Sequence, residues 1–167
     1  MKRSEINAAI RHAEAFFAEH CFHLPPSAHW APESWAARTF DTELIRTLGL
    51  GWDVTDMGGG DFTNQGLLLF TLRNGDAQDS QDSKCYAEKI MIVRECQVTP
   101  WHFHWEKTED IINRGGGDLA VELAWATADE SDLAEDMVTV HCDGLARTVS
   151  AQDCLILHPG ESVTLPP

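Results

Sequence analysis

The sequence predicts a mainly β protein, a sandwich or barrel of short strands that helices precede and cover. Two observations support this: from residue 51 onward, short apolar runs follow one another between glycine, proline and acidic turns, whereas residues 1–50 space their apolar side chains like helices. The length of 167 residues suits one domain with its own core. We therefore expect a single domain over 1–167, with a helical cover at 1–50 and the β part at 51–167.

Two helices are predicted in the first fifty residues. The first starts at Ser4, which is a typical helix cap, and Pro25-Pro26 ends that segment. Its apolar residues recur at helical spacing: Ile6, Ile10, Ala13, Phe16 and Phe17. The second starts at Pro32 and reaches about Leu48, before the glycines at 49 and 51.

Short strands fill the remainder of the predicted fold. Asn74-Gly75 and Cys142-Asp143-Gly144 are hairpin-type turn sequences, and Pro100 favours an edge strand or a bulge. The polar residues 76–83 and the acidic residues 129–136 predict loops. The strands are expected at 67–72, 86–94, 97–105, 119–125, 138–141, 146–149, 154–157 and 162–165.

The charge balance excludes several partners. Twelve Lys and Arg against 27 Asp and Glu give a formal net charge of -15. Such a chain lacks the clustered cations that bind a nucleic-acid backbone or an anionic membrane, so a small-molecule partner is expected. Neither an export signal nor an apolar run of the ~20 residues of a membrane helix is present, which predicts a cytoplasmic protein.

Five cysteines without a C-x-x-C pair argue against a disulfide framework or a zinc ribbon. We expect free, buried thiols, since a reduced cysteine is among the most buried residue types.

The stretch from Trp101 to Glu109 contains the candidate chemistry. On the predicted strand, His102 and His104 would project from one face while Trp101 and Phe103 face the other way. Glu109 follows far enough along the chain to return on a neighbouring strand. Two imidazoles and a carboxylate suit Mn, Fe, Co, Ni or Zn. The alternative is a pair of histidines on a half-exposed strand.

These residues resemble a known motif. His102-x-His104, Glu109 and the following Gly116 are similar to the first motif of the cupin superfamily, which has a jelly-roll β-barrel fold; Cys96 stands where that motif opens with glycine. Gly160 and Pro166 resemble the opening of the second cupin motif, whose histidine would fall near position 171. The resemblance thus implies a C-terminally truncated chain with a barrel that lacks its last strands.

Longer blocks resemble the D-lyxose isomerase family of that superfamily. They are residues 51–56 (GWDVTD), 86–91 (YAEKIM) and 102–117 (HFHWEKTEDIINRGGG). The resemblance implies an aldose–ketose isomerase that interconverts D-lyxose and D-xylulose in carbohydrate metabolism, is a homodimer and depends on Mn(II), with Co, Zn, Fe or Ni as other possible ions. It assigns the metal to His102, His104 and Glu109, and catalytic roles to Lys89, Lys107 and Glu109.

The implied reaction moves a proton between C1 and C2 of the sugar. A divalent ion makes the C–H more acidic and stabilises a cis-enediolate, while a base and an acid relay the proton. Charged Lys107 would stabilise the enediolate oxygen, and neutral Lys107 would be a base. A metal-assisted hydride shift is the other chemical route.

Each candidate residue has an ordinary structural alternative. Lys89 and Lys107 could form surface ion pairs with the preceding glutamates, Glu88 and Glu106. The remaining alternatives are a core position or a sugar contact for Trp101 and Trp105, turn or capping roles for Asp53 and Asp56, and a substitute metal ligand in His141 or His158.

Two further functions compete with the isomerase. One is another metal-dependent cupin enzyme, either a sugar-phosphate isomerase or a dioxygenase; the phosphate enzyme would need a clamp of basic residues. The other is a non-catalytic metal-binding or sugar-binding cupin, which a truncated chain would favour.

Overall fold

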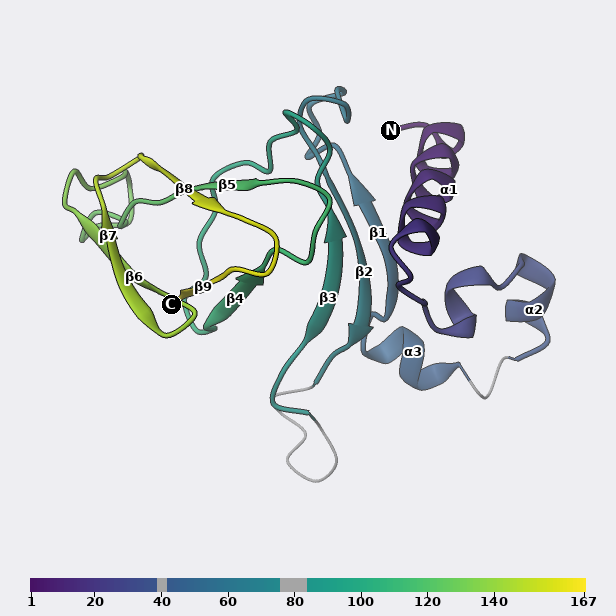
Figure 1. The fold of residues 1–167 in the computed structure, drawn as a ribbon. Coiled ribbons are helices and arrows are strands. Elements are labelled where there is room, and N and C mark those ends of the chain that lie inside the picture. Colours follow the sequence, from purple (N-terminus) through teal and green to yellow (C-terminus); the bar gives the residue numbers. More distant parts are fainter. Residues whose placement is uncertain (39–41, 76–83) are drawn as a thin grey trace. The chain divides into compact units, whose positions relative to one another are not determined.

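The computed structural model describes residues 1–38, 42–75 and 84–167 (Figure 1). Within these residues every helix lies before residue 50 and all the named strands after it pair antiparallel, which confirms the mainly β class with N-terminal helices. The chain packs as two compact units, Met1–Trp101 and His102–Pro167. The single domain over 1–167 stays a prediction.

Helix α1 spans Arg3–Glu19 and begins one residue before Ser4, which is therefore not its cap. Lys2 occupies the cap position, and its backbone N–H donates to Glu5 Oε2 at 2.6 Å. The predicted periodicity is present, since the buried side chains Ala9, Ala13 and Phe17 recur every four residues. None of the helices in the described residues is long and apolar enough to cross a membrane.

The second predicted helix is wrong as one element. The predicted range contains two short helices instead, α2 (Pro32–Ala36) and α3 (Glu43–Thr47), and a 3₁₀ turn, η1 (Pro26–His29), precedes them. Residues 39–41, between α2 and α3, lie outside the described chain. Gly49 ends α3 at a φ of +61°, a conformation that glycine adopts at no steric cost. The N–H of Leu50 reaches back to the carbonyl of Ile45 at 2.9 Å, which closes a Schellman cap.

The first unit contains a three-stranded antiparallel sheet in the order β1-β2-β3. Its strands are β1 (Gly51–Thr55), β2 (Leu67–Arg73) and β3 (Glu88–Ile92). Helix α1 packs on one face, where Ala9, Ala13 and Phe17 meet Leu68 and Ile92 (Figure 1).

The link between β2 and β3 is longer than a tight hairpin. Arg73 pairs with Glu88, so Asn74-Gly75 opens a connection over 74–87 instead of forming a two-residue turn. The loop predicted at 76–83 lies outside the described residues.

The second unit contains a four-stranded sheet, in the order β4-β9-β6-β7, and a two-stranded sheet, β5-β8. Leu157 and Val163 are fully buried in its apolar cluster. Over the described residues none of the sheets closes on itself, so no closed barrel is formed. The strands are β4 (Glu109–Ile112), β5 (Leu119–Glu122), β6 (Val138–Cys142), β7 (Leu145–Val149), β8 (Cys154–Leu157) and β9 (Ser162–Leu165).

The predicted β6–β7 hairpin is confirmed. Cys142 pairs with Leu145, and the two loop residues, Asp143 and Gly144, have φ values of 49° and 83°. Two consecutive positive φ angles define a type I′ turn, whose twist matches that of the flanking strands.

The strand predicted at 97–105 is wrong. Val98 makes only an isolated bridge with Gln65, and the chain from residue 99 to 108 belongs to no strand. Pro100 lacks the N–H that a continuous ladder needs. His102 and His104 therefore lie in an irregular segment that leads into β4.

All five cysteines are free thiols, as expected, but only Cys142 is buried. The expectation of burial is wrong for the other four, which are exposed: Cys21, Cys85, Cys96 and Cys154.

Asn113 fixes the glycine-rich turn after β4. This buried side chain donates from Nδ2 to the carbonyls of Gly117 and Leu157, each at 2.8 Å, and accepts the N–H of Gly115 at 3.0 Å. Its backbone also bonds to Gly160 and Glu161, just before β9. One residue thus holds the ends of β4, β8 and β9 together.

The backbone conformation of Cys96 predicts that glycine at this position stabilises the protein. It is the third residue of a turn closed by a 3.0 Å bond from the Gln97 N–H to the Arg94 carbonyl, and its φ is +57°. A side chain costs about 1–2 kcal/mol in this conformation, of which the greater unfolded freedom of glycine offsets about half. Urea titration should therefore show Cys96→Gly raising the free energy of unfolding by about 0.5–1 kcal/mol.

Two controls isolate the effect of the backbone. Cys96→Ala keeps a Cβ and should give no gain, and Cys154→Gly, inside β8, should lower the free energy of unfolding by about 0.5–1 kcal/mol. A loss of stability in Cys96→Gly would contradict the strain at this turn.

Asn113→Ala should strongly destabilise the second unit, because it removes three hydrogen bonds and leaves the buried Leu157 carbonyl without this donor. We expect a loss of about 2–4 kcal/mol in the free energy of unfolding, measured by urea titration. Asn64→Ala is the matched control, since the exposed Asn64 side chain donates to nearby Asp61 and its loss should cost less than about 1 kcal/mol. Equal losses in both variants would refute the role of Asn113.

Candidate metal centre

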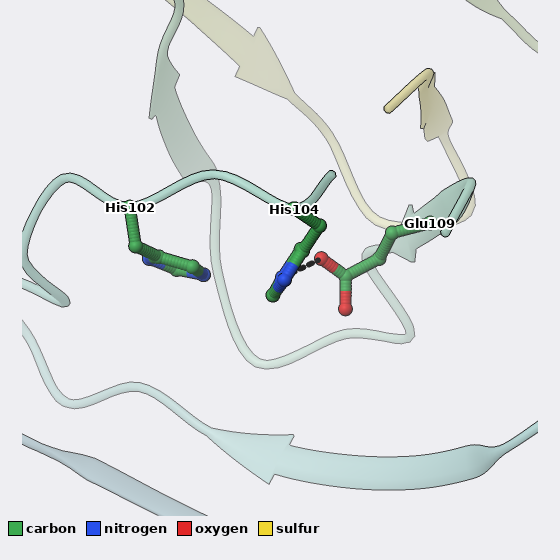
Figure 2. A group of neighbouring side chains, drawn as sticks. All are labelled: His102, His104 and Glu109. Atoms are coloured by element: carbon green, nitrogen blue, oxygen red, sulfur yellow. Dashed lines mark ion pairs between the residues drawn. The ribbon is translucent and has the colours of Figure 1, made fainter. Parts of the chain in front are cut away.

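His102, His104 and Glu109 come together in the second unit, as Figure 2 shows. One possible ligand atom from each residue lies within 4.8 Å of the other two. His104 Nε2 is 3.5 Å from Glu109 Oε2, and the two imidazole centroids are 5.2 Å apart with their planes at 75°. The structure thus groups the three residues expected to bind a metal.

Strand pairing determines where the carboxylate points. Glu109 is the first residue of β4 and lies opposite Leu165 of β9, while Ile111 lies opposite the buried Val163. Side chains two apart on a strand share a face. Glu109 therefore projects from the same face as the apolar cluster, at the end of its strand.

The two histidines reach Glu109 without a strand of their own. They come from the irregular segment before β4, yet they still face each other as residues i and i+2. Phe103 and Trp105, the next two residues of odd number, form a second ring pair whose centroids are 4.7 Å apart. Both pairs join residues i and i+2, as side chains on one face of a strand would, although the predicted strand is absent.

Lys107 belongs to the same cluster. Its Nζ donates to Glu109 Oε1 at 3.2 Å, so one carboxylate oxygen faces Lys107 and the other faces His104. The side chains of Glu109 and Lys107 are 29% and 46% exposed, which leaves this group open to a small molecule. The expected alternative, an ion pair with Glu106, is replaced by the pair with Glu109.

Lys89 lies in the other compact unit, on β3 opposite Thr71, and its side chain is exposed. Glu88, the alternative partner, instead forms an ion pair with Arg73. The catalytic role of Lys89 stays a prediction.

Two tryptophans near the histidines are not core residues. Trp101 and Trp105 are exposed, which excludes that alternative. The indole N–H of Trp105 donates to Glu130 Oε2 at 3.1 Å.

Asp56 has the turn role that the alternative described. It accepts the N–H of Gly58 at 3.0 Å, and this bond is the main reason that the pKa of the Asp56 carboxyl is lowered. Asp53, on β1, is exposed.

The two histidines considered as substitute ligands lie outside the donor group. His158 Nδ1 is 2.8 Å from Asp118 Oδ1, and this hydrogen bond raises the pKa of the imidazole. His141 sits on β6, paired with Thr164 of β9.

The donor group fits a divalent cation. Two imidazole nitrogens and a carboxylate oxygen form bonds of about 2.0–2.2 Å to ions such as Zn²⁺, so ligand atoms on one ion are at most about 4.4 Å apart. The observed spread of 4.8 Å needs only small side-chain rotations to close. Three protein donors leave further coordination positions for water or substrate.

These features define a mainly β protein with a candidate divalent-metal centre built from two histidines and a glutamate. Comparison with known proteins then gives the family. The chain matches the family described as D-lyxose isomerase over residues 1–167, and it belongs to that family.

Two curated relatives are similar over the full length of this chain. A D-lyxose/D-mannose isomerase of Escherichia coli O157:H7 is 51% identical, with 100% of this chain and 74% of that protein covered. A protein of the same name from Serratia proteamaculans is also 51% identical, with 100% and 73% covered.

Sequence reasoning did not identify Glu130. It is one of several acids in the stretch 129–136, and nothing in the local pattern separates it from its neighbours. Its contact with Trp105 depends on the folded path of that loop.

The donor group predicts the effect of removing single ligands. His102→Ala and Glu109→Gln should each weaken Mn(II) binding at least about tenfold, because each removes a donor or the charge that attracts the ion. Titration of free Mn(II), followed by its electron paramagnetic resonance signal, measures the affinity. His12→Ala, an exposed histidine on α1, is the control and should bind like the wild type. Unchanged affinity in both ligand variants would remove these residues from the site.

Proposed function

We propose that this chain is an aldose–ketose isomerase that interconverts D-lyxose and D-xylulose with the aid of a divalent cation, Mn(II) first among the possible ions. The single observation that carries the proposal is the grouping of His102, His104 and Glu109 in a member of the D-lyxose isomerase family. The names of both relatives support the same class of reaction and add D-mannose as a second sugar to test.

The three ligands provide the chemistry that the reaction needs. A divalent cation, when bound, supplies Lewis acidity that makes the C–H beside a sugar carbonyl more acidic. His102 and His104 donate neutral nitrogen lone pairs and Glu109 adds a negative charge, a mixed donor set typical of sites for borderline or hard divalent ions. The partial exposure of the group leaves room for a sugar to approach.

The reaction itself needs no oxidant or reductant. The C2–H bond of the aldose breaks and its proton passes to a base, while the electron pair forms the C1=C2 bond of an enediolate. Return of a proton to C1, and transfer of the O2 hydroxyl proton to O1, gives the ketose. The protein must hold one base near C2 and C1 and one cationic or acidic group near the oxygens.

Lys107 is the residue best placed for the second task. Its ammonium group contacts Glu109 and so lies beside the candidate ligands, where a positive charge would stabilise the developing enediolate oxygen. In its neutral form the same amine would instead act as the base. The variant Lys107→Gln removes both roles and keeps a polar side chain.

Several finer features belong to this proposal. We propose a cupin-type jelly-roll fold, a catalytic role for Lys89, a homodimer, and a cytoplasmic protein of carbohydrate metabolism. Co, Zn, Fe and Ni are the other ions to be tested beside Mn(II).

The activity test uses Mn(II) and D-lyxose, with D-mannose in parallel, and measures ketose formation. Wild-type protein should form D-xylulose, and Lys107→Gln should lower kcat by about 100-fold without weakening Mn(II) binding, because the lysine acts on the sugar oxygens and is not a ligand. Arg11→Gln, an exposed cation on α1, is the matched control and should keep full activity.

Other outcomes identify the competing functions. Conversion of a sugar phosphate alone would indicate a sugar-phosphate isomerase, oxygen consumption without ketose a dioxygenase, and metal binding without turnover a binding module. Each would contradict the proposed reaction. With D-lyxose deuterated at C2, loss of the label to water indicates proton transfer, whereas its retention at C1 indicates a hydride shift.

A further inference from the structure

We propose that Glu130 is a positioning residue for the metal centre, which it orders through the indole of Trp105. This inference rests on the proposed metal centre and goes beyond it by assigning a function to the loop 125–134. The observation behind it is the 3.1 Å hydrogen bond from Trp105 Nε1 to Glu130 Oε2, which joins residues 25 positions apart in the sequence.

The segment that carries the histidines needs external support. Residues 99–108 belong to no strand, and the side chains of Phe103 and Trp105 are exposed, so neither a ladder nor a core fixes this stretch of chain. Trp105 directly follows His104 and precedes Lys107 by two residues. A contact that fixes its indole therefore restricts the backbone between a candidate ligand and the neighbouring lysine.

The loop that presents Glu130 is well ordered by its own hydrogen bonds. Ala126 and Leu133 form a bridge at its base, and the Ala134 N–H donates to the Trp125 carbonyl at 2.7 Å. Thr127 lies at its centre: its hydroxyl contacts Asp129 Oδ1 at 2.7 Å and its carbonyl accepts the Glu130 N–H at 2.8 Å.

The backbone of Glu130 adopts a conformation that few side chains favour. Its φ is +57°, in the left-handed region, where a residue other than glycine is strained. The bonds around Thr127 hold the backbone there, so the side chain of Glu130 starts from a restrained position. Because this backbone has little freedom left to lose, the bond to Trp105 costs less entropy to form than one from a mobile loop.

The aromatic pair extends this support along the segment. Trp105 packs edge to face against Phe103, which lies between the two histidines in sequence, with a centroid distance of 4.7 Å and an interplanar angle of 73°. Edge-to-face pairs of this kind add about 0.5–1.5 kcal/mol to packing. The chain of contacts therefore runs from Glu130 through Trp105 to Phe103.

A double-mutant cycle tests this coupling, with Mn(II) alone as the probe. Glu130→Ala and Trp105→Phe, which keeps a ring but removes the N–H, should each weaken Mn(II) affinity about 3- to 10-fold, and the double variant should be no weaker than either single one. Glu130→Gln retains an oxygen that accepts from the indole and should restore near-wild-type affinity.

Glu135→Ala is the matched control, because it removes the same charge from the same exposed acidic stretch. It should leave the affinity unchanged. A loss equal to that of Glu130→Ala would show a general electrostatic attraction of the ion and would overturn the proposal, as would additive effects in the cycle.

A second readout does not depend on the metal. The indole N–H signal of Trp105, identified in the nuclear magnetic resonance spectrum by its loss in Trp105→Phe, should shift and exchange faster with water in Glu130→Ala but not in Glu135→Ala. An unmoved signal would overturn the contact. Wild-type protein that binds no Mn(II) would overturn the metal centre together with this inference, whereas Mn(II) binding without isomerisation would contradict only the proposed reaction.

Discussion

The pairing of β4 with β9 is the constraint on which the candidate centre depends. Opposite residues in an antiparallel pair share a face, so the register that sets Glu109 against Leu165 also sets Ile111 against the buried Val163. A slip by one residue would bury Asp110 in place of Ile111 and turn Glu109 away from the histidines. The apolar core and the carboxylate ligand are therefore fixed by the same alignment, and Asn113, just past β4, ties that alignment to β8 and the start of β9.

The sequence predicted the last strands of the chain better than the segment with the histidines. β8 and β9 begin and end where their apolar runs do, and Asp143-Gly144 forms the expected turn, because these features depend on local spacing and on glycine at a positive φ. The strand at 97–105 failed because apolar and aromatic residues also occur in exposed segments: Trp101 and Phe103 have strand-like chemistry but no ladder partner among the described strands.

The candidate centre was also predicted only in part: its ligands were identified from the sequence, but the contacts around them were not. Two histidines two residues apart, followed by Glu109, could be identified because their spacing resembles that of a family whose motif is long and specific. The pair between Lys107 and Glu109 was not predicted: neighbouring charges suggested Glu106 instead, and only the start of β4 decides which glutamate the lysine meets. The role of Glu130 could not be predicted from the sequence, since its contact with Trp105 depends on how the chain folds between two residues 25 positions apart.

The sharing of Glu109 between His104 and Lys107 gives the centre a distinctive electrostatic balance. A cation that binds here must approach an ammonium group already paired with the carboxylate, which opposes binding. The net charge of -15 offsets this only in part, because acids more than about 8 Å away are largely screened at physiological salt. The ligands must therefore supply the affinity through well-oriented bonds, and such orientation is most needed where the backbone has no strand to provide it. In the segment before β4, the contact between Trp105 and Glu130 would supply this orientation by restricting the backbone next to His104.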